Sequence, residues 1–281
     1  MDNISIDIVS DLHIDQWDNT LKSKYPCGVR SYKPYDFNDS TRDILVIAGD
    51  VSDDLDISLK FINDISKKYK YVLFVDGNHE HVHRYPKLFT DDEIYKKVKK
   101  FNNPKLFYLN KDHFRIGNTV FIGACGWWDY NNSKDIKRNL SYFKTWIPEF
   151  TKDQSLEFIH NVTEKSKLEA KILQEAIDTY QKDKNIKNIV VVTHTIPIDE
   201  CCSGEPGFKE KNVISTQLNT NLRKIINEKN KISHWIFGHT HDHHECKHNN
   251  IHLICNPRGR PEDYNRLTYK LKTTHLIKSN L

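Results

Sequence analysis

The chain has 281 residues, 37% of them hydrophobic, so it can bury a sizeable core, and 42 Lys and Arg against 38 Asp and Glu leave a formal charge of only +4. This charge is too small to require a nucleic-acid partner, and no apolar run approaches the roughly 20 residues of a membrane span. The six cysteines show no C-x-x-C spacing and the N-terminus resembles no secretion signal, so we expect a soluble, cytoplasmic protein without membrane contact.

The predicted elements alternate between strands and helices. Runs rich in β-branched residues predict strands, and apolar residues at helical spacing predict helices. In chain order these are strands at 4–9 and 43–48, a helix at 55–68, a strand at 71–75, a helix at 91–101, a strand at 119–124, a helix at 153–181, a strand at 188–193, a helix at 215–227, and strands at 233–237 and 251–255. This alternation predicts an α/β protein.

Two local signals refine this organisation. Gly117 and Asn118 lie between two strand-like runs and predict a two-residue hairpin, so we expect mixed sheets. Thr151 and Gln154 match a capping box at the start of a helical stretch, which we interpret as a helical insertion at about 150–184. Since no linker or repeat interrupts the chain, we expect a single domain over residues 1–281.

Polar side chains follow five of the predicted strands at the point where each strand ends. They are Asp11 and His13, Asp50, Asn78 and His79, His194, and His239 and His241. In a sheet whose neighbouring strands are parallel, the carboxyl ends meet at one edge, where open α/β folds bind ligands. Gly49, Gly77 and Gly238 stand beside these residues, where the chain must leave a strand sharply.

These side chains, His79 apart, offer carboxylate and amide oxygens and imidazole nitrogens but no thiolate. Such a mixture suits Mn, Fe or Zn better than Ca or a cysteine-rich zinc site. The candidates are too many for one tetrahedral ion but fit two ions that share a carboxylate. Two ions about 3.5 to 4 Å apart stabilise the attacking and leaving oxygens of a displacement at phosphorus, so the pattern indicates phosphoester hydrolysis.

The order of these residues resembles that of the calcineurin-like metallophosphoesterase family. The family's blocks stand as "DLH" at 11–13, "GD" at 49–50, "GNHE" at 77–80, "H" at 194 and "GHTH" at 238–241. The resemblance implies a four-layer α/β/β/α sandwich with two mixed β-sheets. It also implies two divalent metal ions, Mn before Fe, Zn, Ni or Mg. One ion would be bound by Asp11, His13, Asp50 and His241, and the other by Asp50, Asn78, His194 and His239.

The resemblance further implies a reaction. A metal-bound hydroxide would attack the phosphorus, and His79 would act as general acid on the leaving oxygen, oriented by Asp53. Because "GDVSDDL" departs from the G-D-x-V-D-R-G of serine/threonine phosphatases, a small phosphodiesterase or phosphatase is favoured. We expect a phosphodiester substrate: a nucleotide, a cyclic nucleotide or a nucleic-acid end. A phosphomonoesterase of the same mechanism, or a metal-binding scaffold with little turnover, is the alternative.

Three further residues are candidates for substrate contact. Trp128, in "GWWDYNN", offers a stacking surface, with a core residue as the alternative. Arg258, in "NPRGRP", can bind two phosphoryl oxygens, with a plain turn as the alternative. His243 follows the GHTH block, and we predict that it lies in a polar surface loop together with His244 and His248.

Overall fold

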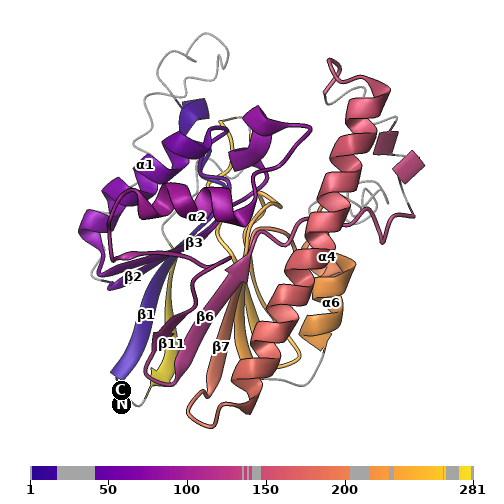
Figure 1. The fold of residues 1–281 in the computed structure, drawn as a ribbon. Coiled ribbons are helices and arrows are strands. Elements are labelled where there is room, and N and C mark those ends of the chain that lie inside the picture. The colour runs from indigo at the N-terminus through magenta and orange to yellow at the C-terminus, as the bar shows by residue number, and fades with distance from the viewer. Residues whose placement is uncertain are drawn as a thin grey trace.

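The computed structural model describes residues 2–17, 42–134, 136–137, 139–140, 147–202, 216–227, 231–261, 263 and 272–279. Two β-sheets form its centre, and helices flank them on both outer sides (Figure 1). The strand order is β11-β1-β2-β3-β4 in one sheet and β5-β6-β7-β8-β10-β9 in the other. None of the helices in the described ranges is both long enough and apolar enough to cross a membrane.

The first sheet is parallel except at one edge. Its strands are β1 (Asp2–Val9), β2 (Ile44–Ala48), β3 (Tyr71–Val75), β4 (Leu106–Tyr108) and β11 (Lys272–Ser279). Strand β11 pairs antiparallel to β1, while β1, β2, β3 and β4 pair in parallel. The first sheet is therefore mixed.

The second sheet is mixed as well. Its strands are β5 (Phe114–Ile116), β6 (Thr119–Ala124), β7 (Asn188–Thr193), β8 (Ile232–Phe237), β9 (His244–His248) and β10 (Ile251–Cys255). Strands β6, β7, β8 and β10 are parallel, whereas β5 and β9 run antiparallel at the two edges. The hairpin predicted at Gly117 and Asn118 joins β5 to β6, so that expectation is confirmed.

Four α-helices and four short 3₁₀ helices complete the described fold. The α-helices are α1 (Leu55–Ile65), α2 (Asp91–Lys99), α4 (Lys152–Lys182) and α6 (Thr220–Asn227). The 3₁₀ helices are η1 (Ile14–Trp17), η4 (Ser66–Lys68), η5 (His79–Arg84) and η6 (Asp199–Cys201). Thr151 and Gln154 form the predicted capping box of α4, which satisfies amide groups that the first helical turn leaves without intrahelical partners.

Three apolar layers hold these elements together. Ile8 and Val46 from the first sheet face Val190 and Ile236 from the second, which fills the space between the sheets. The outer face of the first sheet packs against α1 and α2, and that of the second against α4 and α6. The molecule is thus the expected four-layer α/β/β/α sandwich.

Strands β4 and β11 were not among the predicted elements, and two predicted segments differ from the expectation. The helix predicted at 215–227 begins only at Thr220, because Leu218 forms a β-bridge with Ile196 and Asn219 accepts a hydrogen bond from the Asn221 amide. The prediction of a surface loop around His244 and His248 is wrong, since this segment is the edge strand β9.

Candidate metal centre

The predicted metal ligands lie at the carboxyl ends of five strands, where the two sheets meet. They follow β1 (Asp11, His13), β2 (Asp50), β3 (Asn78), β7 (His194) and β8 (His239, His241). Backbone hydrogen bonds join neighbouring loops, from Asp11 N–H to Gly49 O at 3.0 Å and from Gly238 N–H to His194 O at 2.9 Å. The parallel strands therefore bring distant segments of the chain to one place.

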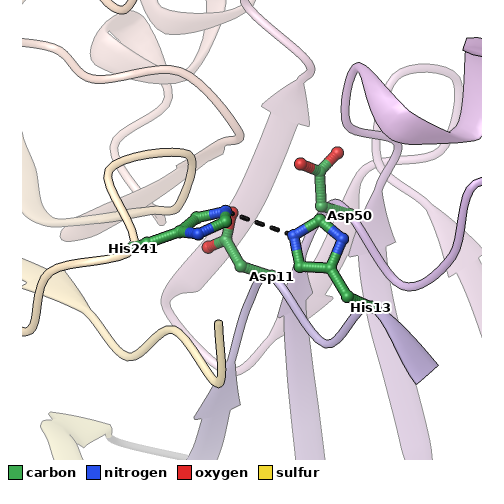
Figure 2. Close-up of side chains that lie close together, drawn as sticks. All are labelled: Asp11, His13, Asp50 and His241. Carbon is green, nitrogen blue, oxygen red and sulfur yellow. Dashed lines mark hydrogen bonds and ion pairs between the residues drawn. The ribbon is translucent and has the colours of Figure 1, made fainter. Parts of the chain in front are cut away.

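Among the described residues, three groups of side chains present ligand atoms within 4.8 Å of one another, and two of them consist of predicted metal ligands, whereas the third joins His13 to His79 and Asp53. The first group is Asp11, His13, Asp50 and His241, and the second is Asp50, His194 and His239. Figure 2 shows the first group, in which His13 and His241 face each other with their Nε2 atoms 3.1 Å apart. Asn78 Oδ1 lies 3.0 Å from His194 Nε2 and adds an amide oxygen to the second group. Asp50 is common to both groups.

Hydrogen bonds at the outer ring nitrogens orient two histidines of the second group. His194 donates from Nδ1 to the Ala48 carbonyl at 2.9 Å, so its Nε2 faces Asp50 Oδ2 at 3.2 Å. His239 donates from Nε2 to the Thr216 carbonyl at 2.9 Å, which leaves its Nδ1 3.2 Å from His194 Nε2. Such outer partners are typical of metal-binding histidines, because they fix the tautomer whose lone pair faces the ion.

In the first group, a carboxylate orients a histidine in the same way. His241 donates from Nδ1 to Asp263 Oδ2 at 2.5 Å, and its Nε2 faces His13. Burial opposes the charged form of His241, but Asp263 and Asp11 together outweigh it and raise the pKa of the imidazole. The inner donor atoms of both groups, carboxylate and amide oxygens with imidazole nitrogens, fit a divalent metal ion.

The electrostatics of the site favour positive charge at its centre. Burial raises the pKa of Asp50, but His194 and His79 outweigh it and hold that pKa well below its usual range. Burial lowers the pKa of His194, yet Asp50 raises it to about 10. Burial, followed by the neighbouring His194, lowers the pKa of His239 to about 3. The ionised Asp50 can obtain its counter-charge either from a proton on His194 or from a cation.

The backbone at the site is strained. Five of the predicted ligand residues have positive φ: Asp11 (50°), His13 (42°), Asp50 (55°), His239 (69°) and His241 (55°). Non-glycine residues rarely adopt this left-handed region, and each such residue costs on the order of 1 kcal/mol. Strain concentrated on these positions marks a functional site, since it persists only where the surrounding structure holds the side chains in place.

Glu80 holds the loops of the site together. Its buried carboxylate accepts hydrogen bonds from the amides of Gly77 (2.7 Å), Asp50 (3.1 Å) and Val51 (2.7 Å), and from the Ser58 hydroxyl (2.9 Å). Burial and then the charge of Asp50 raise the pKa of Glu80 to about 7. This side chain fixes the position of Asp50 relative to the GNHE turn.

His79 lies beside the first group with a partner on each ring nitrogen. Its Nδ1 is 2.5 Å from Asp53 Oδ1. Its Nε2 is 3.8 Å from Asp50 Oδ2 and accepts a hydrogen bond from Arg260 Nη2 at 2.8 Å. His79 therefore stands where it can contact a substrate bound at the ligand groups.

A family model, calcineurin-like phosphoesterase, matches residues 4–243. The chain belongs to this family. The predicted membership, the predicted fold and the expectation of a metal-dependent phosphoester hydrolase are thereby confirmed.

Three individual proteins illustrate the relationship. "Uncharacterized protein L509" of Acanthamoeba polyphaga mimivirus is 24% identical over 278 residues, which cover 92% of this chain and 91% of the relative. The crystal structure of phosphopantetheinyl hydrolase (PptH) from Mycobacterium tuberculosis matches with a TM-score of 0.66 at 14% identity, over 99% of this chain and 97% of that one. A putative 5'-nucleotidase from Staphylococcus aureus matches with a TM-score of 0.50 at 16% identity, over 98% of this chain and 53% of that one. Because both identities are low, the likeness of these two structures to this chain concerns the fold alone.

The three candidate substrate contacts occupy different environments. The Trp128 side chain is buried and stacks on the His239 ring, with centroids 5.3 Å apart. The Arg258 guanidinium is buried above the Trp17 ring at 3.7 Å. His243 is exposed just before β9. Substrate contact by these residues stays a prediction, and the guanidinium that lies against His79 belongs to Arg260.

Three residues of the site were missed by sequence reasoning. Glu80 carried a signal, since it is the last residue of the GNHE block. Asp263 and Arg260 follow β10 in a segment without helical or strand periodicity, and only their nearness to a strand end hinted at a role.

Proposed function

We propose that the chain hydrolyses a phosphodiester at a centre of two divalent metal ions. The first ion would be bound by Asp11, His13, Asp50 and His241, and the second by Asp50, Asn78, His194 and His239. The observation that carries the proposal is the presence of Asp50 in both groups of converging donor atoms. A carboxylate shared in this way suits two ions side by side.

The chain's own residues would position the ions and the substrate. When bound, the ions would supply an activated water as nucleophile and neutralise charge on the phosphoryl oxygens. Asp263 and the Ala48 and Thr216 carbonyls would keep the ligand imidazoles in the required tautomers. Glu80 would maintain the place of the shared carboxylate.

His79 would act on the leaving oxygen as general acid. Its imidazole is held at Nδ1 by Asp53, so that Nε2 faces the ligand groups. The carboxylate at Nδ1 orients the ring so that Nε2 is the nitrogen presented to the leaving oxygen. Asp53 is thus a positioning residue for His79.

The substrate class that we propose is nucleotide-like: a nucleotide, a cyclic nucleotide or a nucleic-acid end. The similarity in fold to a putative 5'-nucleotidase supports a nucleotide, and that to a phosphopantetheinyl hydrolase extends the range to other phosphoesters. Manganese is the ion that we propose, and we also propose a cytoplasmic location, which the cysteine pattern supports. A phosphomonoesterase with the same residues is the second candidate, because nothing in the roles of His79 or Asp50 requires a diester.

A comparison of two variants tests the proposal. Asp50→Ala should lose bound metal and activity together, because both groups lose their shared carboxylate. His79→Ala should retain the metal and lose turnover by roughly 10²–10⁴-fold. Activity is measured on bis-p-nitrophenyl phosphate and p-nitrophenyl phosphate after metal stripping and return of Mn²⁺, and metal content by atomic emission.

Three outcomes separate the candidates. Faster metal-dependent cleavage of the diester supports the phosphodiesterase, and faster cleavage of the monoester supports the phosphatase. Full activity after exhaustive chelation, or equal metal loss in both variants, contradicts the assignment of roles.

A further inference from the structure

The loop that follows β10, residues 256–261, forms hydrogen bonds with Ser10 and Asp11, which directly follow β1. The Arg258 amide donates to the Ser10 carbonyl at 2.9 Å, and the Gly259 amide donates to the Asp11 carbonyl at 2.8 Å. Trp17 adds a third connection, because its indole N–H donates to the Gly259 carbonyl at 3.1 Å. The position of this loop relative to the metal centre is therefore fixed by backbone contacts.

The loop separates its two arginines at Gly259. This glycine has φ 77°, and a Cβ there would stand 2.7 Å from Asp263 Oδ2, so a larger residue does not fit. Before it, Arg258 is buried over the Trp17 ring. After it, the Arg260 amide donates to Asp263 Oδ2 at 2.6 Å, the same oxygen that accepts from His241. Asp263 thus fixes both a predicted metal ligand and the backbone of Arg260.

The Arg260 side chain lies against the catalytic face of His79. Its Nη2 is 2.8 Å from His79 Nε2. A guanidinium only donates hydrogen bonds, so Nε2 is the acceptor in this contact and the ring proton lies on Nδ1, facing Asp53. The nitrogen that faces the ligand groups is therefore covered by a cation.

The Arg260 guanidinium also has a donor atom that is not yet used in a hydrogen bond. Arg260 Nε is buried and has no hydrogen-bond partner among the described residues. A buried donor of this kind costs free energy until an acceptor reaches it. Nε and Nη2 belong to one planar fork, which matches two oxygens of a phosphoryl group better than a single imidazole nitrogen.

We propose that Arg260 binds the non-bridging oxygens of the substrate's phosphoryl group and withdraws from His79 when it does so. Binding of the phosphoryl group would satisfy Arg260 Nε and release His79 Nε2, which would then take up a proton from water and donate it to the leaving oxygen. Arg260 would thus link occupation of the site to exposure of His79. The inference rests on the proposed function, since it assigns a phosphoryl group to the site.

Binding of inorganic phosphate, the simplest ligand with these oxygens, tests the role of Arg260. Isothermal titration of Mn²⁺-loaded protein should give a phosphate Kd that rises roughly tenfold or more in Arg260→Ala. Arg260→Lys should lie between the two, because an ammonium restores the charge without the fork. Arg223→Ala is the matched control, since Arg223 is an exposed arginine paired with Asp199 at 2.8 Å, and its phosphate affinity should equal that of wild type.

The link to His79 has its own readout. In ¹⁵N spectra of histidine-labelled protein loaded with diamagnetic Zn²⁺, phosphate should shift the His79 Nε2 resonance of wild type, assigned with His79→Gln. Arg260→Ala should show that resonance already displaced before phosphate is added. Absence of phosphate binding to loaded wild type, or equal affinity in Arg260→Ala, overturns the inference.

The two proposals fail in distinguishable ways. If wild type binds phosphate through Arg260 but cleaves neither p-nitrophenyl ester nor a dinucleotide, the proposed function fails and the phosphoryl site stands. If wild type hydrolyses phosphoesters and Arg260→Ala keeps both KM and phosphate affinity, the hydrolase stands and the role of Arg260 is wrong.

Discussion

At the scale of single residues, the metal centre depends on a close approach at Gly77. A Cβ at this position would lie 2.1 Å from Asp50 Oδ1 and 2.6 Å from the Asp50 amide, which is far inside van der Waals contact. Asp50 cannot retreat easily, because its Oδ1 accepts from the His79 amide at 2.8 Å and its amide donates to Glu80. The glycine was expected for a sharp turn, and the structure shows that it is also needed for space.

Gly77→Ala should therefore displace Asp50 and weaken metal binding. The added methyl group overpacks a fixed site, which costs about 1–3 kcal/mol of unfolding free energy. Metal content after dialysis and urea unfolding would measure the two effects. Gly117→Asn is the control, because Gly117 lies in the β5–β6 turn at the opposite ends of the strands and asparagine tolerates its φ of 55°. Equal metal content in Gly77→Ala and wild type would disprove the steric argument.

The clustering of the candidate ligands was predictable for a chemical reason. Asp11, Asp50 and His194 each follow a run of apolar β-branched residues, and parallel strands bring such positions to one edge. The orienting residues were not predictable in this way. Asp263 reaches His241 from a segment after β10, and its position depends on tertiary backbone contacts that leave no periodic signal.

At the scale of elements, strands β8 and β10 place two histidines side by side. His234 and His252 are partners in the parallel register, and their ring centroids are 5.4 Å apart. Burial, followed by the repulsion of His252, lowers the pKa of His234 to about 4 from an ordinary value of 6.5. The folded protein therefore binds a proton at His234 less readily than the unfolded chain does.

The sign of the resulting pH dependence follows from this difference. His234 contributes stability above about pH 6.5, and this contribution is lost as the pH falls toward 4, where the unfolded chain is favoured by protonation. In wild type, His234 should lower the unfolding free energy by up to about 2 kcal/mol when the pH falls from 7.5 to 5. His234→Gln should not show this part of the decrease. Thermal unfolding at both pH values would measure it.

His160→Gln provides the comparison, since His160 is exposed on α4. The change in Tm of this variant between pH 7.5 and pH 5 should match that of wild type. A parallel fall of Tm in wild type and His234→Gln would contradict the assigned environment of His234.

The elements show where sequence patterns stop being informative. The central strands were predicted because both faces are buried and their residues are apolar. Strand β9 has the sequence HECKH, carries mostly exposed side chains and lies at a sheet edge, so it lacks the apolar pattern that identifies a strand. Its pairing with β10 comes instead from the hairpin at Asn249 and Asn250, where Asn249 has φ 53°.

At the scale of the whole molecule, the two sheets meet at the metal centre. The first group of ligands comes mainly from the first sheet, and His194 and His239 come from the second. The His239 amide donates to Asp11 Oδ1 at 2.9 Å and so connects the two sheets directly. An ion bound by both groups would connect them further. The organisation as one domain with an insertion at about 150–184 stays a prediction.

This arrangement couples metal binding to protons. In metal-stripped protein, Asp50 raises the pKa of His194 to about 10, so this imidazole is protonated at neutral pH. A metal ion can bind His194 Nε2 only after the proton has left. Metal affinity should therefore rise with pH between 6 and 8, by roughly tenfold per pH unit for each proton released.

Titration calorimetry of the stripped protein with Mn²⁺ at pH 6, 7 and 8 measures this linkage. Repeating it at one pH in buffers of different ionisation enthalpy counts the protons released. Asn78 serves as an internal comparison, because its amide carries no proton to displace and Asn78→Ala should weaken binding without changing the pH dependence. His194→Gln should weaken binding and also lower the proton count by one. A pH-independent affinity in wild type would show that the ion does not bind His194, and the second group of ligands would then need another assignment.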